Sequence, residues 1–309
     1  MKILVVVPEF LPLDQIKAAV STISSDLDVR NDTNFERSDA EILIVTTFTP
    51  VNAELLKKMP RLRFVQVASI GYDNVDLNAM KGNGIIVSNI PTASADSVAE
   101  HALSMVLSLL KDQRFLDSEI RSGRWPKITR STDLMGKTFG IVGMGSIGRA
   151  LASRLLPFKT AIIYYDIKRM SEAEEEEYGA TYVDLNRLLS DADIVSVHVP
   201  LTETTRHLFN KSKFDLMKDG SIFINTSRGE VVVEKDLIEA IKKKGLRAGL
   251  DVFETEPPDP KSELLKLDNT ILSPHIAGVT IESQMRFFKE TIANVLRYMQ
   301  GYEPNFRVA

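Results

Sequence analysis

The 309-residue sequence predicts an α/β protein in which one domain is inserted into another. Three observations predict this class. Short apolar segments alternate with helical patterns along nearly the whole chain, which is typical of parallel strands connected by helices. A glycine-rich turn follows one of these segments at Gly143–Gly148. Two longer helical patterns interrupt the alternation at positions where they could connect two domains.

The first hundred residues predict a small sheet. The N-terminal apolar run is ended by Pro8 and is too short for a signal peptide, so we expect it to form the first core strand. Strands are expected at residues 2–7, 42–45, 64–68 and 85–88, with helices at 52–58 and 76–81.

From residue 138 onward the sequence predicts a larger sheet. Its strands are expected at residues 139–142, 161–165, 194–199, 221–225, 247–251 and 270–272. Six strands with a glycine-rich turn after the first describe a complete dinucleotide-binding half of the Rossmann type. The long helical patterns cover about residues 97–116 and 281–300. We therefore predict a Rossmann domain at 97–280, inserted into a smaller flavodoxin-like α/β domain at 1–96 plus 281–309, with a cleft between them.

The turn Gly143-Met144-Gly145-Ser146-Ile147-Gly148 has the surroundings that a dinucleotide needs, because a strand precedes it and a helix follows it. Gly143 would make the tight turn, and Gly148 would allow the helix to pack closely against the strand. Gly145 would let the backbone approach a pyrophosphate, which the N–H groups of Ser146 and Ile147 would bind. The turn therefore predicts a phosphate-binding site.

Asp166 ends the second strand, eighteen residues after the last glycine of the turn. Its carboxylate would accept hydrogen bonds from a ribose diol and repel a 2′-phosphate. NAD is therefore the expected cofactor in preference to NADP. Lys168 and Arg169 follow closely and could weaken that preference.

The composition argues against several classes of function. A formal net charge of −4 provides no basic face for nucleic acid. The sequence contains no cysteine, which excludes disulfides and thiolate metal sites, and we expect no metal site. The apolar helical pattern at 98–110 is interrupted by Glu100 and His101 and is too short to cross a membrane. We expect a cytoplasmic protein.

The four histidines can be compared as candidates for acid–base catalysis. His101 lies inside a long helix, where a structural role is expected, and His207 lies in a polar surface loop. His198 comes late in a strand and is either structural or close to the cofactor. His275 follows the last strand, directly after Pro274. Ligands bind at the carboxyl ends of the strands in open α/β sheets, so His275 is the candidate for catalysis.

Two other strand ends carry charged residues toward the same edge. Arg228 follows the strand at 221–225, and Glu254 and Glu256 follow the strand at 247–251. An arginine in such a loop more often forms a surface ion pair than a substrate contact. An arginine, an acid and a histidine on three strand ends of one sheet edge nevertheless favour a site.

Together, these segments resemble the D-isomer-specific 2-hydroxyacid dehydrogenase family over almost the whole length of the chain. The resemblance implies that Arg228 is the catalytic arginine, His275 the acid–base histidine and Glu256 its carboxylate partner. Glu256 is preferred over Glu254 because it directly precedes Pro257. The matching segments are 68–76, 97–102, 143–148, 198–202, 225–229, 251–257 and 273–278.

The resemblance also implies roles for these residues. Glu256 would hold the ring of His275 and raise its pKa, so that His275 exchanges a proton with the substrate oxygen while hydride moves to or from NAD. Arg228 would bind the carbonyl and carboxylate of a 2-oxo acid. Backbone N–H groups of Ser69, Ile70 and Gly71 would bind the same carboxylate. Cofactor contacts are further implied at His198, Pro200, Thr226, Asp251 (to the nicotinamide carboxamide) and Gly278.

Two kinds of substrate pair are left open. One is 3-phosphoglycerate with phosphohydroxypyruvate, and the other is glycolate or glycerate with glyoxylate or hydroxypyruvate. Formate dehydrogenases of the family have glutamine at the position of Glu256, so that activity fits poorly. The segment Arg121–Arg130 has four cations and no acid. It could bind phosphate, or it could carry charge at the interface of a homodimer formed through the NAD-binding domain. The sequence ends at Ala309, so no regulatory domain of the phosphoglycerate dehydrogenase type is expected.

Two alternative functions are compatible with the same nucleotide-binding domain. Corepressor relatives use this fold as an NAD-gated protein-interaction module and keep the catalytic trio. They carry extensions beyond the two-domain body, which we do not expect here. An alanine-dehydrogenase-like enzyme is disfavoured by the order Arg228, Glu256, His275 along the chain.

Overall fold

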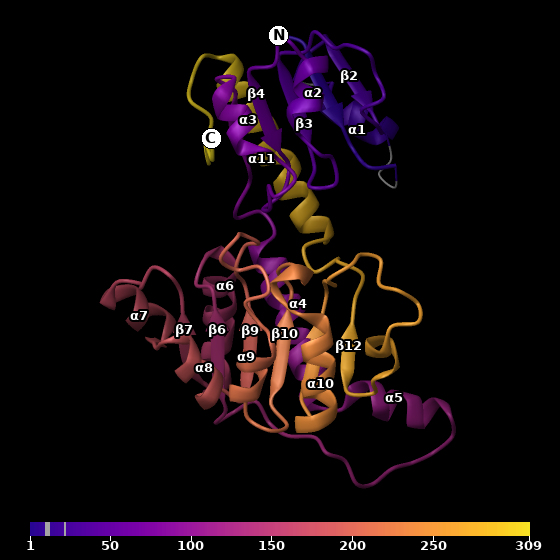
Figure 1. Ribbon diagram of the computed structural model, residues 1–309, viewed down its shortest axis with the longest axis vertical. Coiled ribbons are helices and arrows are strands. Elements are labelled where there is room, and N and C mark those ends of the chain that lie inside the picture. Colours follow the sequence, from indigo (N-terminus) through magenta and orange to yellow (C-terminus); the bar gives the residue numbers. More distant parts are fainter. Residues whose placement is uncertain (10–12, 22) are drawn as a thin grey trace. The chain divides into compact units, whose positions relative to one another are not determined.

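The computed structural model describes residues 1–9, 13–21 and 23–309 (Figure 1). The chain divides into two compact units. Unit 1 comprises Met1–Ser94 and Thr280–Ala309, and unit 2 comprises Ala95–Val279. These divisions lie within two residues of the domain boundaries expected from the sequence.

Unit 1 contains a five-stranded parallel sheet in the order β2-β1-β3-β4-β5, the flavodoxin-like order. The sequence analysis missed the edge strand β2, whose Asp28 and Arg30 pair at 2.8 Å and break the apolar pattern. It also missed helix α1. The elements are β1 Ile3–Val6, α1 Leu13–Val20, β2 Leu27–Arg30, β3 Ile42–Val45, α2 Ala53–Lys58, β4 Phe64–Val67, α3 Leu77–Gly82, β5 Ile86–Ser88 and α11 Ile281–Met299.

Unit 2 contains a seven-stranded parallel sheet in the order β12-β11-β10-β9-β6-β7-β8. This is the Rossmann order with one strand added at β12, so the predicted α/β fold class is confirmed. The sequence analysis expected six strands and missed the three-residue edge strand β8. The strands are β6 Thr138–Val142, β7 Ala161–Tyr165, β8 Ala180–Tyr182, β9 Ile194–Val197, β10 Ile222–Asn225, β11 Arg247–Leu250 and β12 Thr270–Leu272.

The prediction of a single long helix at about 97–116 is wrong. The structure has two helices there, because Asp112 adopts a left-handed conformation with φ of 52° and interrupts the helical path. The helices of unit 2 are α4 Ala95–Leu110, α5 Gln113–Arg121, α6 Ser146–Leu155, α7 Glu172–Tyr178, α8 Leu185–Asp191, α9 Lys211–Leu216 and α10 Glu234–Lys244, with short 3₁₀ segments at Leu156–Phe158, Gly229–Val231 and Glu263–Lys266.

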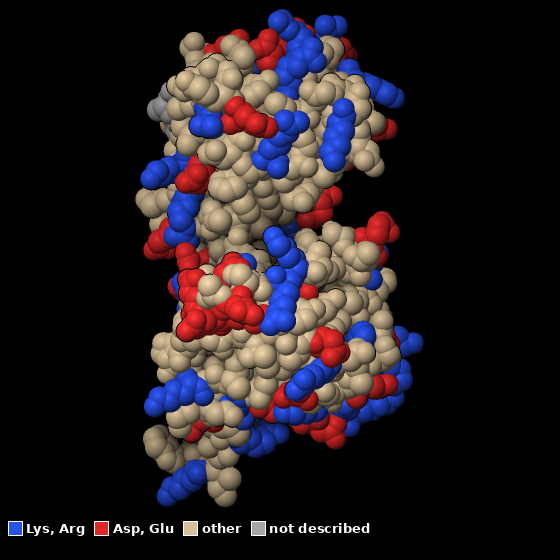
Figure 2. All heavy atoms as spheres, turned by 90° about the vertical axis from the view of Figure 1, so that its left-hand side faces the viewer, with Lys and Arg blue, Asp and Glu red and all other residues tan. Residues whose placement is uncertain are grey.

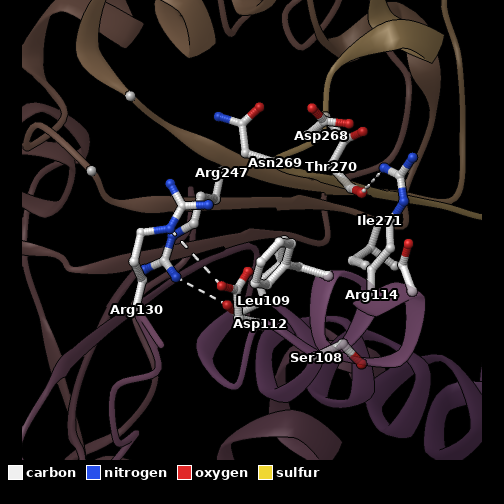
Figure 3. A pocket seen from close by; sticks show the side chains of 14 residues that line it. Ser108, Leu109, Asp112, Arg114, Arg130, Arg247, Asp268, Asn269, Thr270 and Ile271 are labelled. Carbon is white, nitrogen blue, oxygen red and sulfur yellow. Dashed lines mark hydrogen bonds and ion pairs between the residues drawn. The ribbon is translucent and has the colours of Figure 1, made fainter. Parts of the chain in front are cut away.

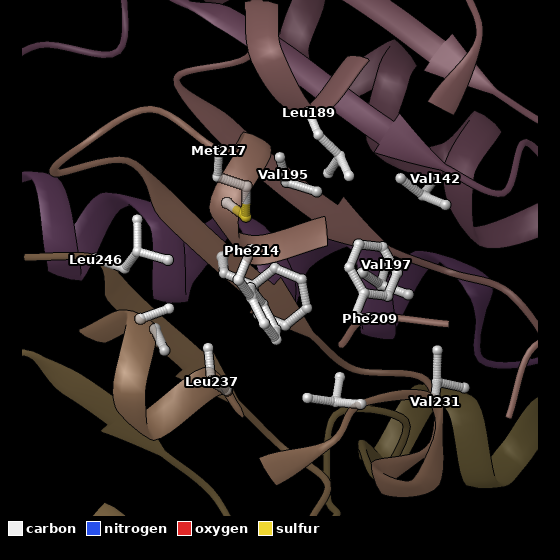
Figure 4. Close-up of a cluster of buried hydrophobic side chains, with 14 of the residues drawn as sticks. Val142, Leu189, Val195, Val197, Phe209, Phe214, Met217, Val231, Leu237 and Leu246 are labelled. Atoms are coloured by element: carbon white, nitrogen blue, oxygen red, sulfur yellow. The ribbon is translucent and has the colours of Figure 1, made fainter. Parts of the chain in front are cut away.

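Both faces of the larger sheet are buried. Side chains of α8, α9 and α10 form one apolar cluster against the strands, where Phe209, Phe214 and Phe223 contact one another (Figure 4). The helices α4 and α6 cover the other face with a second cluster. Alternate residues of β10 serve the two clusters, with Phe223 on one side and Ile222 and Ile224 on the other. A sheet buried on both faces needs such continuous apolar strands.

The acidic run in α7 lies on the surface, and Figure 2 shows acidic and basic side chains gathered side by side on unit 2. Glu175 pairs with Arg169 at 2.8 Å, and Glu174 pairs with Arg149 at 2.5 Å. No helix within the described residues is long and apolar enough to cross a membrane.

Candidate active site

The seven parallel strands of unit 2 end at one edge of its sheet, and six of them carry predicted residues at this carboxyl edge. The residues are Gly143 after β6, Asp166 after β7, His198 after β9, Arg228 after β10, Asp251 after β11 and His275 after β12. The strand order reverses between β6 and β9, which is the place where open α/β sheets bind ligands.

His275 and Glu256 form a hydrogen-bonded pair at this edge. Nδ1 of His275 lies 2.7 Å from Oε2 of Glu256, and both side chains are about one-third exposed, at 37% and 36%. Glu254, the other nearby acid, instead lies 3.5 Å from His207 on the surface. The sequence therefore distinguished correctly which acid pairs with His275.

Several groups act on the pKa of Glu256. Partial burial alone would raise this pKa, but hydrogen bonds from His275 and from the N–H group of Phe253 lower it, as do the charges of His275 and Arg228. The net effect holds the pKa of Glu256 below its usual value. Glu256 is therefore ionised at neutral pH and accepts a hydrogen bond from Nδ1 of His275.

The loop after β10 brings Arg228 close to this pair. A Cβ atom on Gly229 would overlap the carbonyl of Phe253, so only glycine allows the loops after β10 and β11 to touch. Asn225 shapes the same loop, because its Nδ2 donates to the carbonyl of Arg228 at 3.0 Å. The sequence analysis did not single out Asn225 or Gly229 for this positioning.

Asp251 is 1% exposed and holds the loop that carries His275. Its Oδ1 accepts hydrogen bonds from Ser273 Oγ at 2.5 Å and from the N–H of Ile276 at 2.9 Å. Its Oδ2 accepts from the N–H of Ala277 at 2.8 Å. The sequence analysis had given Asp251 only a cofactor contact and missed this second task, which depends on residues more than twenty positions away.

The three glycines of the turn after β6 differ in what surrounds them. Gly143 has a φ of 98°, and a Cβ atom there would lie 2.6 Å from the carbonyl oxygen of His198. A Cβ atom on Gly148 would overlap the carbonyl of Gly143, whereas one on Gly145 would meet nothing within 4 Å. The protein itself requires Gly143 and Gly148, and the open space at Gly145 fits a bound pyrophosphate.

Helix α6 begins in this turn at Ser146, and Ile147 is its second residue. Gly145 caps the helix and has no side chain to bind the first N–H groups, which leaves them available to an anion. At the end of β7, Asp166 faces the same turn, since its Oδ2 accepts a hydrogen bond from the N–H of Met144 at 2.7 Å. Its Oδ1 accepts from the N–H of Lys168 at 3.0 Å.

Two buried polar atoms near the turn have no hydrogen-bond partner among the described residues, Nδ1 of His198 and Oγ1 of Thr226. Burial lowers the pKa of His198 to about 3, so its ring is neutral, and its Nε2 lies 2.9 Å from Ser196 Oγ. Unpaired polar atoms beside an open glycine turn and an acidic strand end fit a dinucleotide. Of the remaining expected contacts, Pro200 is exposed after β9 and Gly278 lies in the turn that follows His275.

The loop Ser69–Gly71 belongs to unit 1, where it follows β4. Ser69 Oγ donates to the carbonyl of Gly71 at 2.8 Å, and Asn89 Nδ2 donates to the carbonyl of Ile70 at 2.7 Å. These bonds fix the backbone of the loop.

A pocket of about 620 Å³ lies at the amino edge of the larger sheet (Figure 3). Arg130, from the segment that could bind phosphate, lines it, but no predicted catalytic or cofactor-binding residue does. Its arginines mostly bind the protein itself. Arg114 donates to the carbonyls of Leu267 and Thr270, and Arg247 donates to the carbonyl of Leu109. This pocket and the predicted chemistry are thus at opposite edges of one sheet.

Comparison with known proteins shows what this arrangement is similar to. Residues 103–277 match the model of the family described as "D-isomer specific 2-hydroxyacid dehydrogenase, NAD binding domain". A glyoxylate reductase of Korarchaeum cryptofilum is 38% identical over 86% of this chain and 82% of its own length. A hydroxypyruvate reductase of Thermotoga maritima is 38% identical over 84% of this chain and 85% of its own. A D-lactate dehydrogenase structure from Aquifex aeolicus, complexed with NAD and lactic acid, has a TM-score of 0.87 and 32% identity, covering 97% of this chain and 96% of that one.

Proposed function

The chain belongs to the D-isomer specific 2-hydroxyacid dehydrogenase family, and from this membership we propose that it reduces a small 2-oxo acid to a D-2-hydroxy acid with NADH. The observation that carries the proposal is the pairing of His275 with Glu256 at the edge where Arg228 also lies. Hydride transfer needs a proton donor for the substrate oxygen and a cation that polarises the carbonyl group.

NADH supplies the hydride when it is bound. His275 donates its proton from Nε2 to the carbonyl oxygen, and in the reverse direction it takes the proton back. Glu256 binds Nδ1, so it orients the ring and stabilises the charged imidazolium that precedes donation.

Arg228 binds the carbonyl oxygen and one carboxylate oxygen of the substrate through the parallel N–H groups of its guanidinium. The N–H groups of Ser69, Ile70 and Gly71 bind the other side of the carboxylate. In this proposal residues 1–96 and 281–309 form the substrate-binding domain, and residues 97–280 form the NAD-binding domain.

The cofactor contacts are proposed for the groups that fit a dinucleotide. Gly145, Ser146 and Ile147 bind the pyrophosphate, with Gly143 and Gly148 shaping their turn, and Asp166 binds the adenosine ribose. In the bound cofactor, Oγ1 of Thr226 and Nδ1 of His198 gain the hydrogen-bond partner that they lack among the described residues. Pro200 and Gly278 contribute surface to the same site, and Asp251 binds the carboxamide while it holds its loop.

Glyoxylate and hydroxypyruvate are the proposed substrates, supported by the names of the relatives that match along most of their length. Phosphohydroxypyruvate is the second candidate, supported by a further relative named D-3-phosphoglycerate dehydrogenase, which is 38% identical over 83% of this chain and 50% of its own length. The cations of Arg121–Arg130 do not support it, because Arg130 lines the pocket at the opposite edge of the sheet. We propose that the enzyme acts in the cytoplasm.

A homodimer through the NAD-binding domain is supported by apolar surface next to α5. No residue of α5 is buried, Trp125 is 78% exposed and Ile128 is 90% exposed. Apolar side chains clustered on one exposed segment mark interaction surfaces. Sedimentation of the purified protein at several concentrations would test this, and a Trp125→Ser, Ile128→Ser double variant is expected to be monomeric.

The function is tested by NADH oxidation with glyoxylate, hydroxypyruvate, phosphohydroxypyruvate, pyruvate and a branched 2-oxo acid. We expect rapid turnover of one of the first three, and a loss of roughly 10²–10⁴-fold in kcat/KM for His275→Ala. A loss of less than threefold would remove His275 from the mechanism. If NADH binds tightly and no 2-oxo acid is reduced, the NAD-gated interaction module becomes the better assignment.

A further inference from the structure

A chain of hydrogen bonds runs from helix α4 to the loop that carries His275. Nε2 of His101 lies 2.9 Å from Ser273 Oγ, and Ser273 Oγ lies 2.5 Å from Asp251 Oδ1. The residues come from three separate elements of unit 2, and His101 is separated from Ser273 by 172 positions in the sequence.

The proton positions in this chain follow from counting donors. Ser273 has one hydroxyl proton, which it donates to Asp251 Oδ1. Ser273 Oγ can then only accept from His101, so Nε2 of His101 carries a proton. That proton-bearing nitrogen also lies 3.8 Å from Oδ1 of the buried Asp251.

The other end of the chain is the backbone on both sides of His275. Asp251 accepts from the N–H groups of Ile276 and Ala277 through its side chain, and its own carbonyl accepts from the N–H of His275 at 2.7 Å. His275 has a φ of 54°, a conformation that a residue with a side chain adopts only when its surroundings hold it there. Asp251 supplies much of that restraint.

Glycine places α4 where His101 can join this chain. A Cβ atom on Gly249 of β11 would lie 3.0 Å from Met105 Cβ and 2.7 Å from Ile224 Cδ1, so α4 lies directly on the strand there. His101 is one helical turn before Met105, and Asp251 is two residues after Gly249. The close contact therefore brings His101 to the carboxyl end of β11.

We propose that His101 and Ser273 are positioning residues, which act through Asp251 to fix the direction of the His275 imidazole. This inference rests on the proposed function, since His275 is taken as the proton donor. Neither residue needs to touch the substrate. Their loss would leave NADH affinity intact and would lower kcat, because a misdirected proton donor can cost up to about 10²-fold in rate.

Three variants and a control test the proposal. Ser273→Ala and His101→Leu break the chain, whereas His101→Gln keeps an N–H donor near Ser273. His207→Gln is the matched control, because His207 is a surface histidine of the same unit. For each protein we would measure kcat and KM for the 2-oxo acid, the Kd for NADH, and hydrogen–deuterium exchange of a peptide covering residues 273–279 without ligand.

We expect Ser273→Ala and His101→Leu to lower kcat at least tenfold, with the Kd for NADH within twofold of wild type. The amides of Ile276 and Ala277 should exchange faster in both variants, and His101→Gln should recover much of the loss. Unchanged kcat and unchanged exchange would overturn the proposal. A wild-type protein that reduces none of the acids would instead overturn the proposed function, and the exchange data would still decide whether His101 and Ser273 hold the loop.

Discussion

The two edges of the sheet in unit 2 are built from the same strands and differ in what their charged groups bind. At the amino edge, Arg114 and Arg247 donate to backbone carbonyls and line a cavity of about 620 Å³. At the carboxyl edge, Arg228, Glu256 and His275 act on one another, and buried polar atoms nearby have no partner among the described residues. The charged groups of the amino edge bind the protein's own backbone, whereas those of the carboxyl edge are proposed to bind a ligand.

This difference shows why a cavity that is lined by charged residues is not by itself evidence of chemistry. The backbone carbonyls at the ends of helices and strands need hydrogen-bond donors. Arginine has several N–H groups and can supply them where a hollow in the surface exposes these carbonyls. Catalysis needs groups held against one another and accessible at the same time. The comparison can be tested by changing residues at each edge.

Arg228→Gln should have the largest effect, because it removes the charge that binds and polarises the substrate. We expect kcat/KM to fall by about 10²–10³-fold, with the Kd for NADH unchanged. The exposed Arg206→Gln in the same unit is the matched control and should retain wild-type kinetics. Wild-type turnover by Arg228→Gln would mean that the carboxyl edge does not hold the substrate.

Glu256→Gln should lower kcat/KM by about 10-fold to 10²-fold, since the charge that stabilises protonated His275 is lost while a hydrogen-bond acceptor stays. The same variant tests stability. The pKa of Glu256 is lowered by folding, so its ionisation stabilises the folded state above about pH 4.5 and this contribution disappears as the pH falls below that value. Urea unfolding at pH 7 and pH 3.5 should show a smaller advantage of wild type over Glu256→Gln at pH 3.5; an equal difference at both pH values would contradict this.

Asp166→Ala should reduce the preference for NADH over NADPH by about tenfold, because hydrogen bonds to a charged group are lost. The Kd of each cofactor, measured by fluorescence, is the direct readout. Asp166→Asn removes the charge but keeps one acceptor oxygen, which can accept from the N–H of Met144 or from that of Lys168, as the two carboxylate oxygens now do separately. An unchanged preference in both variants would assign it to Lys168, Arg169 or the shape of the pocket.

Arg247→Met should have the smallest effect on activity, with kcat/KM within twofold of wild type. It leaves the carbonyl of Leu109 without its donor, so the free energy of unfolding should fall by about 1–3 kcal/mol. A large loss of kcat without a loss of stability would break the distinction between the two edges.

The sequence predicted the carboxyl edge better than it predicted how that edge is supported. The turn at Gly143–Gly148 and the strand end before His275 are local patterns, and both lie where expected. The contact of His101 with Ser273 has no local signal, because it depends on how closely α4 packs against β11. The break between α4 and α5 was missed because Asp112 resembles an ordinary helical residue until its φ is known. The edge strand β8 was missed because its three residues are too few to show a strand pattern.

Gly145 differs from Gly143 and Gly148 in whether selection acts through folding or through cofactor binding. A side chain at Gly143 or Gly148 would collide with the protein's own backbone, so substitutions there should reduce the amount of folded protein in a cell. A methyl group at Gly145 meets nothing, so the fold tolerates it, and only the bound cofactor would be displaced. In a mutational library of this turn, a screen for abundance would accept alanine at 145 and reject it at 143 and 148, whereas a screen for growth that depends on the enzyme would reject all three.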